Sequence, residues 1–184
     1  MKLVKAQGKM KTPQTVFTLR VPTADGVFPA VYSQTGLCEL SFPRRNAPHL
    51  FEQASDVPKQ VQQWHSLTCQ AVERLLAGLP PGRLPPLDIS AGTEFQRQVW
   101  GAMRAIPFGK TLSYQEIALS IGNPKACRAV GGACGANPIP LLIPCHRVLA
   151  AHKHLGGFSG GLDWKIKLLS REGSWTPELD IFST

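Results

Sequence analysis

Residues 113–135, SYQEIALSIGNPKACRAVGGACG, decide the fold of the C-terminal half of this 184-residue chain. A capping-box pattern predicts that a short helix begins at Ser113, and Gly122 ends it. Asn123 then predicts the cap of a further helix over residues 125–134. Two short helices joined by a tight turn are a helix-turn-helix candidate, although such pairs are also common packing units.

The second of these helices is unusually rich in glycine. Gly131, Gly132 and Gly135 each cost up to ~1 kcal/mol relative to alanine in a helix interior, so something must require a smooth surface. One interpretation is close helix–helix packing, and the other is close approach of a ligand. An ordinary helix is ~10–12 Å across and the DNA minor groove only ~6 Å wide, so a slim helix could enter that groove. Arg128, the one long side chain in the middle of the helix, would then project into the duplex.

The chain divides at residues 79–87, LPPGRLPPL, where four prolines and a glycine interrupt every regular pattern. We therefore expect an N-terminal domain over residues 1–85 and a C-terminal domain over residues 86–184. Residues 16–43 alternate short apolar runs with turns, which predicts a small antiparallel sheet. Pro29 is then expected at an edge or a bulge of that sheet.

Further helices are predicted on both sides of this boundary. Apolar residues at helical spacing predict one helix that ends at Gly78, and a capping box at Thr93 opens another that stops before Pro107. Asp163 can cap a last helix, whose C-terminal end carries Glu172. A carboxylate there is unfavourable with the helix dipole, so Glu172 is expected to have a partner such as a protonated or donating histidine.

Composition narrows the classes of protein. The net charge of +8 favours a polyanionic partner. No run approaches the ~18 apolar residues of a membrane span, and the basic N-terminus lacks the apolar region of a secretory signal. Five irregularly spaced cysteines argue for free thiols in a reducing compartment.

The stretch 143–149, IPCHRVL, places a thiol beside an imidazole. A cysteine reacts as the thiolate, and an unperturbed thiol with a pKa of ~8.5 is mostly protonated at neutral pH. His146 or Arg147 could supply the base or the positive field that a reactive Cys145 needs. The alternative is a buried structural cysteine next to a surface histidine.

Two other features are weaker. The glycine-rich residues 156–161 lack the Lys-Ser/Thr ending of a nucleotide-binding P-loop, which favours a mobile lid or a tight turn over a pocket. His65 and Cys69 lie four residues apart, and Cys38 and His49 could join them, but the spacing matches no standard metal signature. We expect no metal.

Five motifs between Gly92 and Gly173 resemble, in order and spacing, those of the O6-alkylguanine-DNA alkyltransferases. They are GTEFQRQVW, FGKTLSYQEIA, GNPKACRAVGGACGANP, LIPCHRV and GGFSGGLDWKIKLLSREG. The resemblance implies an α/β (α+β) chain with a ribonuclease-H-like N-terminal domain of a small antiparallel sheet and helix. The C-terminal domain is then mostly helical, winged-helix-like and DNA-binding, and contains the helix-turn-helix. The N-terminal half resembles the family only in size and coarse pattern.

The resemblance also implies a function, which is direct-reversal DNA repair. The protein would flip an O6-alkylguanine out of double-stranded DNA, bound through the minor groove, and take the alkyl group onto its own cysteine. Each molecule acts once, because nothing expels the resulting thioether. The family implies a monomer without a cofactor, and free thiols with a DNA partner favour the cytoplasm or nucleus rather than a membrane.

Roles carry over onto matching positions. Cys145 would be the nucleophile and His146 its base, acting through a water and held by Glu172. Tyr114 would donate to N3 of the guanine, and Asn137 would brace the turn that bears the cysteine. The base pocket would be lined by Val148, Phe158 and Ser159. The DNA-binding residues would be Ser113, Lys125, Ala126, Arg128, Ala129, Gly131 and Cys134, with Arg128 filling the stack that the flipped base vacates.

Some residues depart from the family pattern. Position 158 is Phe where some members have Tyr, so a hydroxyl contact is lost while stacking remains. Cys134 stands near the expected minor-groove face, where it would be exposed to oxidation. No cysteine precedes Cys38, which argues against the structural zinc that some members bind through N-terminal cysteines and histidines.

Three alternatives stay open. An alkyltransferase-like sensor binds the lesion without repairing it, but that class has tryptophan at the cysteine position. A hydrolase built on Cys145, His146 and Glu172 would turn over many times and would not need Arg128. A helix-turn-helix transcription factor would need polar side chains on its recognition helix to contact bases in the major groove, where this chain has alanine, glycine and cysteine.

Overall fold

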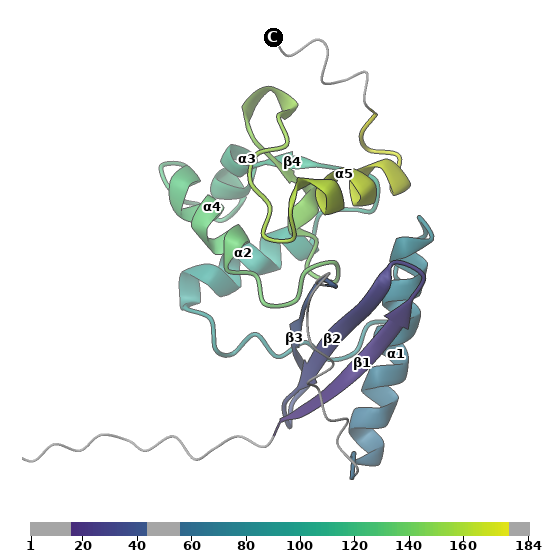
Figure 1. Ribbon diagram of the computed structural model, residues 1–184. Helices are drawn as coiled ribbons and strands as arrows, with labels where there is room; N and C mark the ends of the chain where they lie inside the picture. Colours follow the sequence, from purple (N-terminus) through teal and green to yellow (C-terminus); the bar gives the residue numbers. More distant parts are fainter. Residues whose placement is uncertain (1–15, 44–55, 177–184) are drawn as a thin grey trace, which may run out of the picture.

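The computed structural model describes residues 16–43 and 56–176 and shows a mixed α/β protein in two halves (Figure 1). The N-terminal half is the predicted antiparallel meander, of strands β1 (Phe17–Thr23), β2 (Gly26–Tyr32) and β3 (Leu37–Leu40), with α1 (Lys59–Leu76) packed along it beside β1. The predicted sheet and its helix are therefore confirmed.

The prediction that Pro29 lies at an edge or a bulge is wrong. Pro29 belongs to β2, the central strand, where it pairs with Arg20. Its carbonyl accepts from the backbone N–H of Ser41, just past the end of β3. The ring nitrogen of Pro29 thus faces β3, which has already ended at this point. The N–H that proline lacks therefore removes no hydrogen bond between the two strands.

The C-terminal half is a cluster of helices (Figure 1). They are α2 (Glu94–Arg104), α3 (Tyr114–Ser120), α4 (Cys127–Gly135) and α5 (Leu162–Arg171), with 3-10 turns at Cys145–Arg147 and Ala151–Lys153. Both predicted capping boxes are present, at Thr93 and at Ser113. Strands β4 (Leu112–Ser113) and β5 (Val148–Leu149) form a two-residue parallel ladder that ties the base of α3 to the segment after the cysteine.

Helix α4 begins later than predicted. The Asn123 carbonyl accepts from the backbone N–H of Ala126, which closes a turn before the helix. Lys125 and Ala126 therefore precede α4, and Arg128 lies in its first turn rather than in its middle.

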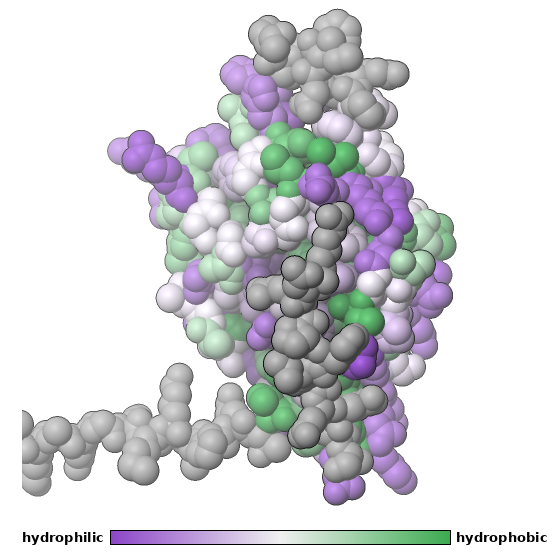
Figure 2. All heavy atoms as spheres, in the orientation of Figure 1, coloured by the Kyte–Doolittle hydropathy of each residue, from purple (hydrophilic) through white to green (hydrophobic). Residues whose placement is uncertain are grey.

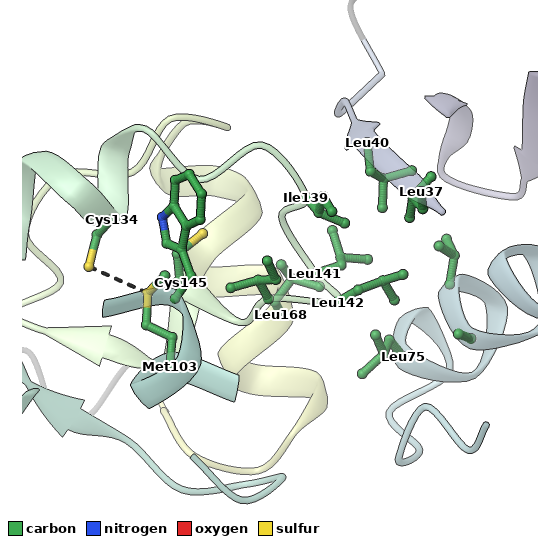
Figure 3. Packing of buried hydrophobic residues seen from close by; sticks show 14 of the residues in the cluster. Leu37, Leu40, Leu75, Met103, Cys134, Ile139, Leu141, Leu142, Cys145 and Leu168 are labelled. Carbon is green, nitrogen blue, oxygen red and sulfur yellow. Dashed lines mark hydrogen bonds between the residues drawn. The ribbon is translucent and has the colours of Figure 1, made fainter. Parts of the chain in front are cut away.

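The two halves share one hydrophobic core, although the division at residue 85 remains a prediction. The segment that leads to Cys145 lies between them, and the backbone N–H of Leu40 donates to the Pro138 carbonyl at 2.9 Å. Figure 3 shows the apolar side chains that meet there, which are Leu37, Leu40, Leu75, Ile139, Leu141 and Leu142.

None of the helices in the described residues combines the length and the hydropathy needed to cross a bilayer. On the face drawn in Figure 2, hydrophilic and hydrophobic side chains are interspersed and form no continuous apolar band.

Candidate active site

Cys145 sits at the start of a buried turn. All of residues 139–149 are buried, so the apolar run before the cysteine anchors it in the core. Asn137 holds this turn from both sides: its Nδ2 donates to the Ile143 carbonyl at 2.7 Å, and its Oδ1 accepts from the backbone N–H of Ile139 at 3.0 Å. The thiol is thereby fixed in position by hydrogen bonds that do not depend on any ligand.

His146, Glu172 and Arg147 form a buried network next to this thiol. His146 Nε2 lies 2.9 Å from Glu172 Oε1. Arg147 donates through Nε to Glu172 Oε2 at 2.8 Å and through Nη2 to Oε1 at 2.9 Å. Its Nη1 donates to the Ile106 carbonyl at 2.8 Å, which attaches the guanidinium to the segment just after α2. Glu172 was expected to have a partner at its helix end, and it has two, His146 and Arg147.

The proton positions follow from this network. Burial would raise the pKa of Glu172, but hydrogen bonds from His146 and Arg147 outweigh it and lower the pKa to about 2. The ionised carboxylate can only accept, so Nε2 of His146 carries the hydrogen. Burial lowers the pKa of His146 despite the carboxylate, which favours a neutral ring. Its Nδ1 then holds a free lone pair, and it has no hydrogen-bond partner within the described residues.

Cys145 itself rests as a neutral thiol. Burial raises its pKa, and the hydrogen bond from Asn137 and the charge of Lys165 only partly oppose this. A thiol held in this form needs a base before it can attack, and Nδ1 of His146, on the next residue, is a basic atom of the network that has no hydrogen-bond partner within the described residues. The arrangement can therefore generate a thiolate inside a closed, poorly solvated site.

Lys165 is a buried residue of the site that the sequence analysis missed. Its Nζ donates to the Val148 carbonyl at 2.7 Å and to the Leu155 carbonyl, so it joins β5 to the loop that follows. Burial lowers the pKa of Lys165 to about 8. Arg147 was considered, with His146, as a source of the base or the positive field that Cys145 needs, but not as a partner of Glu172. The burial of Arg147 could have been predicted, because it is a charged residue inside an apolar run. The burial of Lys165 could not, because a lysine on an amphipathic helix is expected on the exposed face.

Tyr114 and the glycine-rich loop lie against each other. Burial raises the pKa of Tyr114, and the thiols of Cys134 and Cys145 add to the shift. A Cβ built on Gly156 would stand 3.4 Å from the Tyr114 hydroxyl, which places the loop directly against that side chain. Along the same loop Phe158 is half-buried and Ser159 is exposed, while Val148 is fully buried in β5.

The surface of α4 is open where its glycines lie. A Cβ added at Gly132 or Gly135 would meet nothing within 4 Å, and one at Gly131 would only reach Tyr114 at 4.0 Å. Close packing within the described residues therefore does not explain Gly132 or Gly135. Arg128 and Ala129 are exposed, as is Lys125 just before the helix, and Ala126 and Gly131 are half-buried.

Two of the predicted DNA-facing residues are placed differently. Cys134 is buried, with its Sγ 3.5 Å from the sulfur of Met103 on α2, and Figure 3 shows it pointing into the core. Burial raises its pKa to about 12, so the expected exposure to oxidation is wrong. The hydroxyl of Ser113 is engaged with Glu116 in the capping box, donating to Oε2 at 2.7 Å.

The residues considered for zinc do not assemble into a ligand set within the part of the chain described. His65 is placed between the Tyr32 hydroxyl, 3.1 Å from Nδ1, and Cys69, whose Sγ is 3.5 Å from Nε2. Cys38 donates instead to the Val31 carbonyl. His49 lies outside the described residues.

Known proteins of similar sequence match the part of the chain that carries this site. Residues 94–174 match the family model described as 6-O-methylguanine DNA methyltransferase, DNA binding domain. The methylated-DNA–protein-cysteine methyltransferase of Methanosarcina acetivorans is 52% identical over 96 residues, which are 50% of this chain and 62% of that protein. The chain spans between 40% and 66% of the lengths of three curated relatives that it matches.

Solved structures cover more of the chain. The O6-methylguanine methyltransferase of Mycobacterium tuberculosis is 31% identical with a TM-score of 0.67, and the alignment covers 91% of this chain and 99% of the other. A structure described as OGT of the same organism in complex with DNA is 32% identical with a TM-score of 0.66, covering 91% and 98%.

Proposed function

Because this chain belongs to the 6-O-methylguanine DNA methyltransferase family, we propose that it repairs DNA by transferring an alkyl group from O6 of guanine to Cys145. The observation that carries the proposal is the buried His146 ring, whose Nε2 is bound by Glu172 and whose Nδ1 is left as a free base beside the thiol. Burying a histidine together with an ionised carboxylate costs free energy, and a cysteine with only a structural role does not require such a base next to it.

The transfer is a displacement in which one bond forms as another breaks. The Cys145 proton passes, through one water, to Nδ1 of His146, and the imidazolium is stabilised by Glu172. The thiolate then attacks the alkyl carbon in line with the C–O6 bond. That bond breaks with its electron pair on the guanine, whose N3 accepts a hydrogen bond from Tyr114 as negative charge builds there. The released guanine regains the proton that the thiol gave up.

The reaction ends at the thioether. Expelling the alkyl group would require a second nucleophile, such as a water activated by Nδ1 of His146, to attack the carbon bound to Cys145 and displace its sulfur. The carbon of an unactivated thioether resists such an attack, because it is a much poorer electrophile than the O6-alkyl carbon. Each molecule therefore acts once, which separates this proposal from a Cys-His-Glu hydrolase.

DNA is proposed to bind along α4 through the minor groove. The open surface at Gly132 and Gly135 supports this, because it lets the helix backbone approach the groove walls. Arg128, in the first turn, is proposed to fill the stack left by the flipped base, with Lys125, Ala126, Ala129 and Gly131 against the strands. Ser113 would contribute from its backbone, since its hydroxyl is engaged in the capping box.

The flipped base is proposed to enter between Tyr114 and the loop that bears Phe158 and Ser159, above Val148. Finer features of the fold belong to the same proposal. The sheet and α1 would correspond to a small ribonuclease-H-like domain ending at residue 85, and the helical half to a winged-helix-like domain. We further propose that the protein acts as a monomer without a metal or cofactor, in the cytoplasm or nucleus.

Intact-protein mass spectrometry tests the proposal. The protein is incubated with a duplex that carries one O6-methylguanine, and the Cys145→Ala variant is the matched control. We expect a gain of one methyl group per molecule, saturating at equal stoichiometry and absent in the variant. Tight lesion binding without a mass change would instead indicate a sensor, and multiple turnover on a small ester or amide would indicate a hydrolase.

A further inference from the structure

We propose that Phe42, which belongs to the N-terminal half, determines which alkyl groups the site accepts by holding Phe158 in place from behind. This inference rests on the proposed function, because it concerns the size of the pocket in which the alkylated guanine would react. It assigns to the N-terminal half a part in substrate selection.

The two halves meet through four aromatic rings. Phe42 follows β3, and its ring centroid lies 5.5 Å from that of Phe158 in the glycine-rich loop, at an interplanar angle of 66°. The same ring lies 4.9 Å from Trp164 of α5 and 5.8 Å from Phe28 of β2. Phe28 and Trp164 also pack edge-on, at 5.5 Å. Tilted and edge-to-face pairs are the favoured arrangements of aromatic rings, so three such partners hold Phe42 in one position.

There is no free space behind Phe158. A Cβ built on Gly160 would lie 2.6 Å from two ring carbons of Phe42 and 2.9 Å from Cε1 of Phe158. The loop backbone at Gly160 thus passes so close to both rings that a side chain at this position would collide with them. Phe158 cannot retreat towards the N-terminal half while Phe42 stands in its place.

Phe158 also lies near groups that surround Cys145. Lys165 Nζ lies 6.0 Å from the centroid of the Phe158 ring, and the same Nζ donates at 2.7 Å to the carbonyl of Val148, three residues after Cys145. The loop itself packs against Tyr114 through Gly156. Phe158 therefore packs against the N-terminal ring of Phe42 and lies close to a residue that contacts the segment after Cys145.

Removing the Phe42 ring should enlarge the pocket. With Phe42→Ala, the Phe158 ring gains space into which it can move back, so a bulky O6 substituent meets less resistance. A pocket change of methylene size alters discrimination by roughly 10-fold or more, and the volume released here is larger. We expect the ratio of benzyl to methyl transfer rates to rise by at least ~10-fold.

The test compares transfer rates from two duplexes of one sequence, carrying O6-methylguanine or O6-benzylguanine. Wild type, Phe42→Ala and the milder Phe42→Leu are measured, and Phe28→Leu is the matched control. Phe28 is fully buried in the same cluster and pairs with Phe42 and Trp164, but forms no aromatic pair with Phe158. Melting temperatures show which variants are folded. If Phe42→Ala does not fold, the comparison is made with Phe42→Leu.

A raised benzyl-to-methyl ratio in the Phe42 variants with an unchanged ratio in Phe28→Leu supports the inference. An unchanged ratio in a folded Phe42 variant, with wild-type methyl transfer intact, overturns it and leaves the proposed function standing. An equal rise in Phe28→Leu also overturns it, because general loosening of the cluster then explains the effect. Absence of transfer by the wild-type protein overturns the proposed function and this inference together.

Discussion

Replacing Glu172 by glutamine tests the proton relay most directly, because the shape of the side chain is kept and its charge is removed. The carboxylate accepts from His146 Nε2 at 2.9 Å and from Arg147 Nε and Nη2 at 2.8 and 2.9 Å. Glutamine offers one acceptor oxygen instead of two, and it turns an NH2 donor towards groups that are themselves donors. At least one of these buried donors is then left unpaired.

The structure gives two measures of the cost to stability. The pKa of Glu172 is about 2 against an ordinary 4.5, which corresponds to a contribution of ~3 kcal/mol. Because the folded-state pKa is the lower one, this contribution is present above about pH 4.5 and is lost as the pH falls through about 2. Independently, a buried cation that loses its partner costs ~3–5 kcal/mol, and the guanidinium of Arg147 is buried.

The effect on transfer should be larger than the effect on stability. The imidazolium that forms as Cys145 loses its proton would have no counter-charge, and loss of the equivalent carboxylate in a serine-protease triad lowers the rate by ~10⁴-fold. Transfer rates are measured in single turnover with protein in excess over the lesion duplex, and stability by urea denaturation.

The double variant Glu172→Gln with Arg147→Met separates the two effects. Removing both charges together should restore much of the stability, whereas methyl transfer should stay slow because His146 still has no carboxylate. A Glu172→Gln protein that is folded and transfers methyl at the wild-type rate would refute the relay. A double variant that regains the transfer rate along with stability would show that Glu172 serves only to neutralise Arg147.

Three further outcomes are expected. Gly132→Leu should fold with equal or higher stability, since its surroundings are open and Gly is a poor helix former, yet bind duplex DNA more weakly in an anisotropy titration; normal binding would place the DNA elsewhere. Arg128→Ala should slow repair of duplex DNA but spare transfer from free O6-benzylguanine, because no base stack then needs filling; equal losses on both substrates would argue against that role. Cys134 should resist iodoacetamide in the native protein while Cys127, half-buried, reacts faster, as peptide mapping would show; rapid labelling of Cys134 would contradict its burial.

The features predicted correctly from the sequence are those with local causes. The capping boxes at Thr93 and Ser113 are satisfied within four residues of chain, so the sequence specifies them without reference to the rest of the fold. The burial of the Cys134 side chain could also have been predicted from the sequence. Val130, Ala133 and Cys134 follow the i, i+3, i+4 spacing of a buried stripe, and that periodicity outweighs the resemblance that placed Cys134 at the groove.

The features that were missed depend on groups far apart in the chain. Arg147 meets Glu172 across 25 residues, and Lys165 meets the Val148 carbonyl across 17. Burial of Arg147 depends on the Glu172 carboxylate, and burial of Lys165 depends on the carbonyls of Val148 and Leu155. The sequence indicated that Glu172 needs a partner, but it did not identify the groups that Arg147 and Lys165 would contact, and residue type alone argues for exposure of both cations. The pairing of Phe42 with Phe158 is hidden for the same reason, since it spans both halves of the chain.

The charges that were missed explain why a buried thiol can react at all. At rest the site holds one carboxylate, Glu172, and two buried cations, Arg147 and Lys165, around a neutral thiol. The set therefore carries an excess of positive charge, to the extent that Lys165, with its pKa of about 8, is protonated. Moving the proton from Cys145 to His146 leaves the net charge of this buried set unchanged, but the thiolate then forms in the positive field of Lys165 and the imidazolium forms against Glu172. Burial thus suppresses the thiolate before a lesion arrives, and the same low dielectric strengthens the attraction that stabilises it during attack.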